Sequence, residues 1–140
     1  MYNYLILHGA SGIKDAKWAG WLKEELEGDG NEVILPCFPS KLNATPERWE
    51  DILGGYKGSV SQSTVVIAHS IGCLLAINYL SKKNLAVRAL VFVAGADSKK
   101  FAEGLPKDKA EYLREVIYPF LPSKGGKSKI KDLVREIICV

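Results

Sequence analysis

Short apolar runs alternate with longer amphipathic stretches along most of this chain. The short runs have the length and β-branched composition of strands, and they cover residues 4–8, 32–35, 64–67 and 87–94. Between them, apolar residues recur at spacings of three and four, which predicts helices over residues 15–27, 46–56 and 71–80. Strands that alternate with helices are typical of a parallel sheet that carries helices on both faces.

The helices have recognisable first residues, and the strands suggest a simple order. Asp15 and Thr45 are suited to cap the first two helices, and Pro46 is suited to a first helical turn. Right-handed crossovers between parallel strands favour a doubly wound, three-layer α/β sheet. We expect the strand order 2-1-3-4-5, in which residues 9–12 and Ser70 leave the sheet at the switch point between the first and third strands.

Two further stretches follow the fourth strand. Apolar residues at helical spacing predict a helix over residues 110–120 that Pro119 and Pro122 bring to an end, and its position suits a lid over a site. The last residues allow two interpretations, either one amphipathic helix from Ser128 or a short helix followed by a strand over residues 137–140. We favour the strand. It would form an uncovered sheet edge, so we expect self-association through this C-terminal edge.

The third strand runs directly into its helix through Ala68-His69-Ser70-Ile71-Gly72. This sequence matches the nucleophile-elbow pattern G-x-S-x-G, with alanine in the first glycine position. A reversal from strand to helix within one residue strains the backbone of the central serine and requires small residues two positions away on either side. The serine hydroxyl then projects beside free helix amides, of which the Ile71 amide is the first donor to an oxyanion. A serine that merely caps the helix is the simpler alternative.

Composition and charge narrow the class of protein. The 140 residues are 47% hydrophobic and 25% charged, which is typical of one globular domain. No apolar stretch has the length of a membrane span, and the first residues do not resemble a secretion signal, so we expect a cytoplasmic protein without a membrane partner. The net charge of +3 comes largely from a lysine-rich stretch at 124–131 that lacks interleaved aromatics, which does not favour nucleic-acid binding.

The sequence indicates neither a metal site nor a cofactor. Cys37, Cys73 and Cys139 are far apart, so their spacing fits neither a disulfide framework nor a zinc site. Buried free thiols are the simplest interpretation of these three residues. No other feature of the sequence implies a metal or an organic cofactor, so the chemistry is expected to come from the side chains themselves.

Several of these segments together resemble a known family. They are His8-Gly9, the helix from Trp18 to Leu26, Pro36 to Pro39, Glu47 to Glu50, and the elbow from Ala68 to Cys73. This set resembles the small serine hydrolases of the retinoblastoma-binding protein nine type, within the α/β-hydrolase superfamily, well over residues 3–97 and loosely beyond. The resemblance implies that Ser70 is the nucleophile, and that amides of Ile71 and of Gly9 or Ala10 form an oxyanion hole.

The sequence departs from this family at the other two positions of the catalytic triad. Family members place an aspartate after the next strand and a histidine near the carboxyl end. Here no histidine follows Ser70; His69 belongs to the elbow turn, and His8 is expected to brace the loop after the first strand. Asp97 ends the fourth strand, but we interpret it as a cap for residues 98–103. We therefore expect that the chain lacks the family's last strand and helix, with the acid and the base, as a shortened gene product or a fragment.

The function predicted from the sequence is that of a serine hydrolase. It would cleave a small ester or amide substrate through an acyl-enzyme on Ser70. Two alternatives stay open, namely a non-catalytic binding protein that keeps the fold, and an enzyme that transfers the acyl group to an acceptor other than water. A lone serine hydroxyl is a weak nucleophile, so we expect the chain as given to be a poor catalyst.

Overall fold

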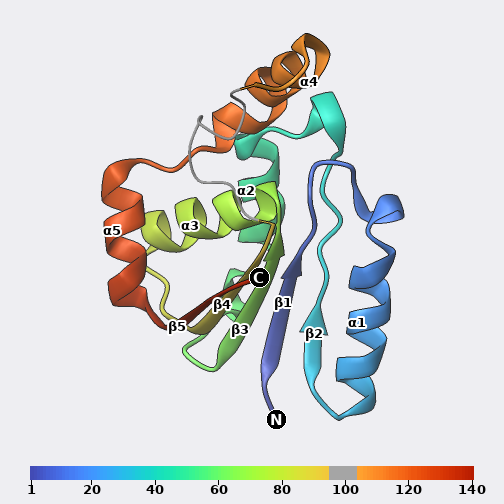
Figure 1. Ribbon diagram of the computed structural model, residues 1–140. Helices are drawn as coiled ribbons and strands as arrows, with labels where there is room; N and C mark the ends of the chain where they lie inside the picture. Colours follow the sequence, from blue (N-terminus) through green and yellow to red (C-terminus); the bar gives the residue numbers. More distant parts are fainter. Residues whose placement is uncertain (95–103) are drawn as a thin grey trace.

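The computed structural model of the chain describes residues 1–94 and 104–140. Within these residues, five strands form one parallel sheet in the order β2-β1-β3-β4-β5 (Figure 1). The strands are β1 (Asn3–Leu7), β2 (Glu32–Ile34), β3 (Thr64–His69), β4 (Val87–Val93) and β5 (Val134–Cys139). The doubly wound sheet and the strand order predicted from the sequence are confirmed.

Helices cover both faces of the sheet. The helices are α1 (Lys17–Gly28), α2 (Pro46–Gly54), α3 (Ile71–Lys83), α4 (Lys107–Tyr112) and α5 (Lys124–Leu133). Helix α1 lies on one face, and α2, α3 and α5 lie on the other (Figure 1). The side chains of β1 separate the two layers, because Ile6 packs with Ala16 and Ala19 near α1, whereas Leu5 and Leu7 join the larger core under the other helices.

The predicted cap of the first helix is wrong, and that of the second is confirmed. Asp15 closes a short 3-10 turn, η1 (Ile13–Asp15), and α1 begins two residues later at Lys17. The backbone of Ala16, with φ −98° and ψ 54°, is not helical, so α1 cannot extend back through it. Thr45 does cap α2, since its hydroxyl accepts a hydrogen bond of 3.3 Å from the Arg48 amide.

The single helix expected over residues 110–120 is three short pieces instead. Helix α4 passes into a π-helical turn, η5 (Leu113–Ile117), and then into a 3-10 turn, η6 (Tyr118–Phe120). Pro119 explains the break, because proline has no amide to donate and its ring clashes with the preceding helical turn. The apolar residues of this stretch nevertheless form a packed face, since Val116, Ile117 and Phe120 are buried.

The C-terminal segment is a helix followed by a strand, as favoured over one long helix. Helix α5 starts at Lys124, earlier than expected, because the Ser123 hydroxyl accepts a bond of 3.0 Å from the Gly126 amide and caps it. Strand β5 also starts earlier, at Val134, where it pairs with Val87 of β4. The first half of β5 contains polar residues, because side chains of an edge strand can face the solvent.

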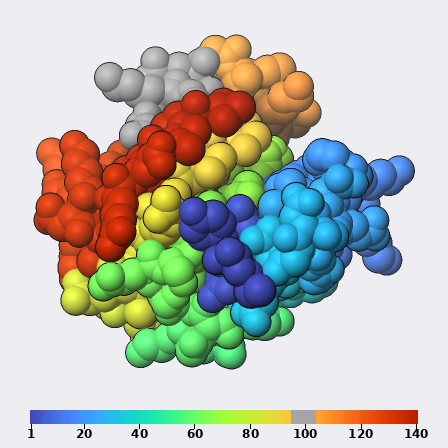
Figure 2. Space-filling view, turned by 90° about the horizontal axis from the view of Figure 1, so that it is seen from below, coloured from blue at the N-terminus to red at the C-terminus, as the bar shows by residue number. Residues whose placement is uncertain are grey.

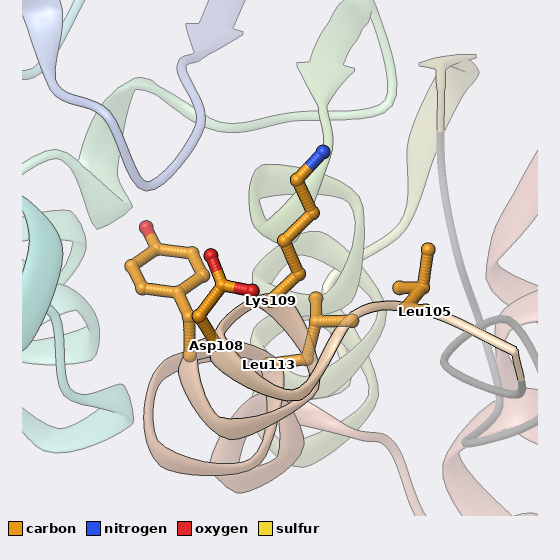
Figure 3. Close-up of a pocket in the computed structure, with 5 residues that line it drawn as sticks. Leu105, Asp108, Lys109 and Leu113 are labelled. Carbon is orange, nitrogen blue, oxygen red and sulfur yellow. The ribbon is translucent and has the colours of Figure 1, made fainter.

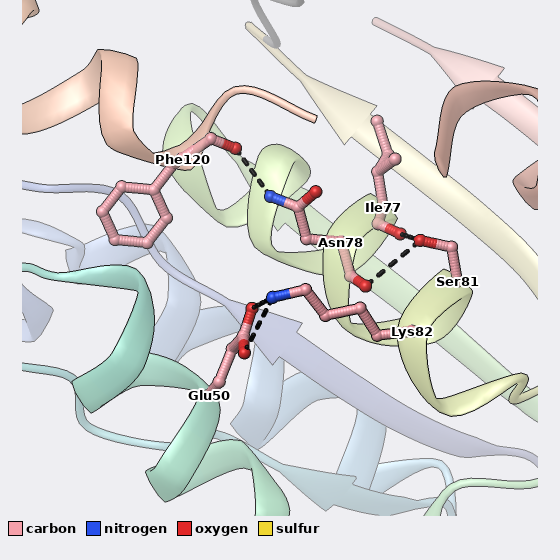
Figure 4. A network of polar contacts seen from close by, with 6 residues as sticks. All are labelled: Glu50, Ile77, Asn78, Ser81, Lys82 and Phe120. Atoms are coloured by element: carbon pink, nitrogen blue, oxygen red, sulfur yellow. Dashed lines mark hydrogen bonds and ion pairs between the residues drawn. The ribbon is translucent and has the colours of Figure 1, made fainter. Parts of the chain in front are cut away.

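Helix α3 is tied to the elements on either side of it (Figure 4). The side-chain amide of Asn78 donates to the Phe120 carbonyl at 2.7 Å. This bond fixes the end of residues 104–121, which we call the lid segment because the sequence led us to expect a lid there. The Lys82 ammonium group lies 2.9 Å from the Glu50 carboxylate of α2. The Ser81 hydroxyl donates to the Ile77 carbonyl at 2.6 Å, within α3 itself. The helix that follows the elbow is thus held by α2 and by the lid.

One apolar row crosses the sheet on the side that carries α1. Ile6 pairs with Ile67, Ile67 with Val91, and Val91 with Ile138. Ile6 is fully buried near α1, whereas Ile138 at the far end is 41% exposed, as is Ile137 on the opposite face of β5. Figure 2 shows β5 and β4 beside each other at the molecular surface. In the described part of the chain, the β5 end of this row is therefore partly exposed to solvent.

Candidate active site

Ser70 occupies the turn between β3 and α3. Strand β3 ends at His69, α3 begins at Ile71, and Ser70 between them has φ 52° and ψ −121°. The strained backbone predicted for this residue is confirmed, because a positive φ costs a non-glycine residue on the order of 1–3 kcal/mol. The Ser70 side chain makes no capping hydrogen bond to α3. A serine that only caps the helix would make that bond, so this alternative loses its support.

The small residues on either side of Ser70 allow the turn. A β-carbon added to Gly72 would lie 2.7 Å from the Leu7 carbonyl oxygen and 2.9 Å from that of His8, so the first turn of α3 rests directly on the end of β1. Ala68 is fully buried, and it pairs with Leu7 on one side and with Phe92 on the other. The elbow therefore needs glycine at position 72 and a small residue at position 68.

The loop after β1, residues 9–12, lies against the elbow. A β-carbon added to Gly9 would lie 3.3 Å from the Ser70 Cβ. The Gly12 amide donates to the Gly9 carbonyl at 3.3 Å, which closes this loop into a turn. The Ala10 carbonyl accepts a bond of 2.7 Å from the Lys41 amide, so the loop is also held from the side of η2 (Lys41–Asn43). The structure thus brings Gly9 and Ala10 into the neighbourhood of Ser70 and Ile71.

His8 is buried, and hydrogen bonds to the backbone occupy both of its ring nitrogens. The Phe38 amide donates to Nε2 at 2.9 Å, which requires an unprotonated Nε2 and assigns the proton to Nδ1. Nδ1 then donates to the Gly9 carbonyl at 2.8 Å. Burial lowers the pKa of His8, against a smaller opposite effect of the bond to Gly9. This neutral histidine joins the loop after β1 to the loop after β2.

His69 belongs to the face of the sheet that carries α1. Its ring packs edge-on against Trp18, with the ring centroids 5.8 Å apart. Its Nδ1 would lie only 2.9 Å from a β-carbon added to Gly9. Burial lowers the pKa of His69 as well. The chain contains two histidines, and these contacts give each of them a role in packing the loops.

The aromatic surroundings of His8 were not predicted from the sequence. Phe38 and Trp49 are stacked with ring centroids 4.5 Å apart, and both contact the His8 ring. The indole NH of Trp49 donates to the Pro39 carbonyl at 2.8 Å, and Phe120 of the lid segment packs edge-on against the same indole. Residues far apart in sequence form this group, so no local pattern could indicate it.

The lid segment carries a shallow hollow of its own. It has a volume of about 430 Å³ and is lined by Leu105, Asp108, Lys109, Tyr112 and Leu113 (Figure 3). All five residues come from α4 and its flanks, so the hollow belongs to the lid rather than to the elbow. Asp97, the acidic residue considered from the sequence, lies outside the described residues, as does the helix over 98–103 that it was expected to cap.

In the described part of the chain, no helix has the length and apolar character needed to cross a bilayer. Within the same residues, no group of three or more histidine, cysteine or acidic side chains is placed to hold a metal ion. Cys73, next to the elbow, is a buried thiol that donates to the Ala68 carbonyl at 3.2 Å. Burial raises its pKa to about 12, so Cys73 is a packing residue. Cys37 and Cys139 are exposed, which corrects the expectation that all three thiols are buried.

Comparison with known proteins gives this site a context. The Serine hydrolase family matches residues 4–116. The protein YdeN of Bacillus subtilis (strain 168) is 30% identical over 103 residues, which are 72% of this chain and 52% of YdeN. The solved structure of the ydeN gene product from B. subtilis is similar with a TM-score of 0.78 and 25% identity, covering 99% of this chain and 71% of that one.

A more distant structure has the same fold. A carboxylesterase structure from Nitrososphaera gargenis is 16% identical, with a TM-score of 0.60, and covers 99% of this chain and 71% of that one. This chain spans about half the length of the curated relative YdeN. The family match runs from β1 across the elbow and into the lid segment, and together with the relationship to YdeN it shows that the chain belongs to the Serine hydrolase family.

Proposed function

We propose that the protein is a serine hydrolase that acts on a small ester or amide through an acyl-enzyme on Ser70. The observation that carries this proposal is the backbone of Ser70, which is held at φ 52° between β3 and α3 with its side chain free of the helix amides. Family membership supports the same activity. Within the family, we propose the retinoblastoma-binding protein nine type and a carboxylesterase-like specificity, on the resemblance of the segments around Gly9 and Ser70.

The proposed chemistry starts at the hydroxyl of Ser70. Its oxygen attacks the substrate carbonyl carbon, solvent water takes up the hydroxyl proton, and the carbonyl oxygen becomes an oxyanion. Amides of Ile71 and of Ala10 or Gly9 would donate to that oxygen, since Ile71 opens helix α3 and Gly9 lies against Ser70. The alcohol or amine then leaves with the proton, and water hydrolyses the acyl-enzyme.

We propose that neither of the two histidines of the chain serves as the base of the triad. Both ring nitrogens of His8 are bound to backbone groups, and His69 packs against Trp18. These contacts support the idea that neither histidine activates Ser70. Loss of the base in serine hydrolases typically reduces turnover by about 10⁶, while the oxyanion hole and binding retain about 10³ to 10⁴ over water. We therefore expect the chain as given to be a slow hydrolase.

A fluorophosphonate probe tests the proposal. The chain should be labelled slowly, and Ser70→Ala should abolish that labelling, with Ser63→Ala as a matched control on an exposed turn. A fusion that adds the part of YdeN without a counterpart here should label much faster, again through Ser70. Labelling of the unextended chain at the rate of ordinary serine hydrolases would show that an effective base is present.

A non-catalytic binding protein is the second candidate. The observation in its favour is the engagement of both His8 nitrogens, which keeps His8 from acting as the base of Ser70. In that case the extended fusion would remain unlabelled although it is folded. Acyl transfer to another acceptor would instead give labelling of Ser70 together with product formation only when an alcohol or amine acceptor is added.

A further inference from the structure

A cleft of about 660 Å³ opens on the outer side of the loop after β1. It lies between residues 11–15 of that loop and its 3-10 turn, and residues 37–48 that follow β2. A volume of this size is typical of sites for small molecules. Its apolar wall is formed by Ile13, Phe38 and Pro39. We call this cleft the basic cleft, because most of its charged side chains are cationic.

Three cationic side chains line the basic cleft, and one carboxylate accompanies them. The cations are Lys14, Lys41 and Arg48, and the carboxylate is Asp15. Among the described residues, none of the three cations forms an ion pair. The Arg48 guanidinium makes long hydrogen bonds of 3.4 Å to the backbone carbonyl and the side-chain oxygen of Asn43. The excess positive charge is therefore available to a ligand.

The neighbouring surface has the opposite charge. A second hollow of about 510 Å³ shares Ser40, Lys41 and Asn43 with the basic cleft, but its other charged residues are Asp108, Glu111 and Glu115. An anionic group would be repelled by these three carboxylates and attracted by the three cations that line the basic cleft. The charge distribution thus selects the basic cleft for an anion.

The loop after β1 connects the basic cleft to Ser70. Gly9 at one end lies against Ser70, and Gly12 at the other end lines the cleft. The bond from the Gly12 amide to the Gly9 carbonyl makes the loop a tight turn, whose ends are less than about 7 Å apart. The Lys41 amide bonds to Ala10 in the same loop, so the wall of the cleft and the loop form one unit.

We propose that the basic cleft binds the carboxylate of a small ligand, and that the substrate of Ser70 is an ester or amide that carries such a carboxylate. The planar guanidinium of Arg48 matches a carboxylate in two parallel bonds, and Lys14 and Lys41 of the same cleft add positive charge. Ile13, Phe38 and Pro39 contact the carbon chain of the ligand. The second part of the proposal rests on the proposed function of Ser70, whereas the first part does not.

A matched pair of ligands tests the proposal without requiring catalysis. Monomethyl succinate carries one carboxylate, and dimethyl succinate has nearly the same skeleton without charge. Titrations followed by backbone amide resonances should show saturable shifts at Gly12, Lys41 and Arg48 with the monoanion. We expect the monoanion to bind at least about tenfold more tightly than the neutral diester, since a charge-assisted bond contributes about that factor.

Variants of the cleft provide the control for net charge. Lys41→Gln and Arg48→Gln should each weaken binding of the monoanion by about three- to tenfold and leave the diester unaffected. Lys57→Gln removes the same charge from an exposed turn outside the cleft and should change binding less than about twofold. Equal affinity for both ligands, or equal losses in all three variants, would overturn the proposal.

The two parts of the proposal fail in different ways. The Ser70→Ala variant should still bind the monoanion. Binding of the monoanion should also shift the backbone amide resonances of Ile71 and Gly72. Anion binding without shifts at these amides would remove the link to Ser70 and keep the cleft as a separate site. Fluorophosphonate labelling of Ser70 with no preference for the monoanion would refute the cleft and leave the proposed hydrolase function intact.

Discussion

Gly9 leaves no room for a side chain beside Ser70, because a β-carbon added to Gly9 would lie 3.3 Å from the Ser70 Cβ and 2.9 Å from the His69 Nδ1. Gly9→Ala should therefore push the loop after β1 away from the elbow and lower the free energy of unfolding by about 1–2 kcal/mol. Urea unfolding and the amide resonances of Ser70 and Ile71 would measure both effects. Gly20→Ala in α1, where a β-carbon meets nothing within 4 Å, is the control and should be neutral or stabilising.

Gly72→Ala should be more damaging than Gly9→Ala. Its β-carbon would lie 2.7 Å from the Leu7 carbonyl oxygen, and backbone cannot move aside as a side chain can. We expect a loss of more than about 2 kcal/mol in the free energy of unfolding. Gly54→Ala at the end of α2, where the added carbon meets nothing, should not destabilise the protein. If Gly72→Ala were as stable as Gly54→Ala, the close contact between α3 and the end of β1 would be contradicted.

The three thiols should differ in reactivity. Cys37 and Cys139 are exposed, whereas Cys73 is buried and its pKa is raised to about 12. Only the thiolate reacts with iodoacetamide, so two thiols should be alkylated rapidly at pH 8 in the folded protein and the third only after denaturation. Peptide mapping by mass spectrometry identifies the protected residue, and rapid alkylation of Cys73 would contradict its burial.

Acidification should destabilise the fold through His8. Burial keeps the pKa of His8 below its ordinary value, so as the pH falls below about 6.5 the unfolded chain takes up a proton that the folded chain does not. His8 should therefore contribute its full stabilisation above about pH 6.5. The free energy of unfolding should decrease as the pH falls toward the pKa of His8 in the folded state. Urea unfolding between pH 8 and 5.5 measures the decrease, and an NMR titration of His8 reports its pKa directly. The pKa of His69 is lowered as well, so the variant His69→Gln should show only part of the loss of stability on acidification. A pKa of His8 at or above 6.5 would contradict the prediction.

The open edge at β5 should promote self-association. Ile137 and Ile138 are each 41% exposed on an edge strand, and edge strands with apolar side chains pair with other chains. Sedimentation at increasing concentration should show dimers or larger species, and Ile138→Lys should shift them toward monomer. Leu42→Lys, which changes a 71% exposed residue of η2, is the matched control and should not. A strict monomer at all concentrations would refute this prediction.

Long-range order in the fold was predictable, whereas local detail often was not. The order of the strands follows from apolar runs separated by crossover helices, a pattern that spans the whole chain. The break at Pro119 and the late start of α1 depend on single backbone conformations, such as that of Ala16, which tertiary contacts decide. The turn of Ser70 was predictable because its steric requirements are local and fall on residues 68 and 72.

The surroundings of the elbow could be predicted from the sequence much less well than the turn itself. The neutral state of His8 depends on a bond from Phe38, thirty residues away in sequence. The basic cleft joins Lys14 to Lys41 and Arg48, which no spacing rule connects. Sequence patterns report which residues are buried along one element, but contacts between loops arise only once the sheet has placed the ends of β1 and β2 side by side.

The strand order has a consequence for synthesis of the protein. Strand β2 pairs with β1, β3 pairs with the free side of β1, β4 pairs with β3, and β5 pairs with β4. Each strand therefore joins a neighbour that has already left the ribosome, and no position in the sheet must wait for a segment made later. The sheet can therefore grow outward in the order of translation, and Ser70 lies in a part of the chain that is made before the lid segment and α5.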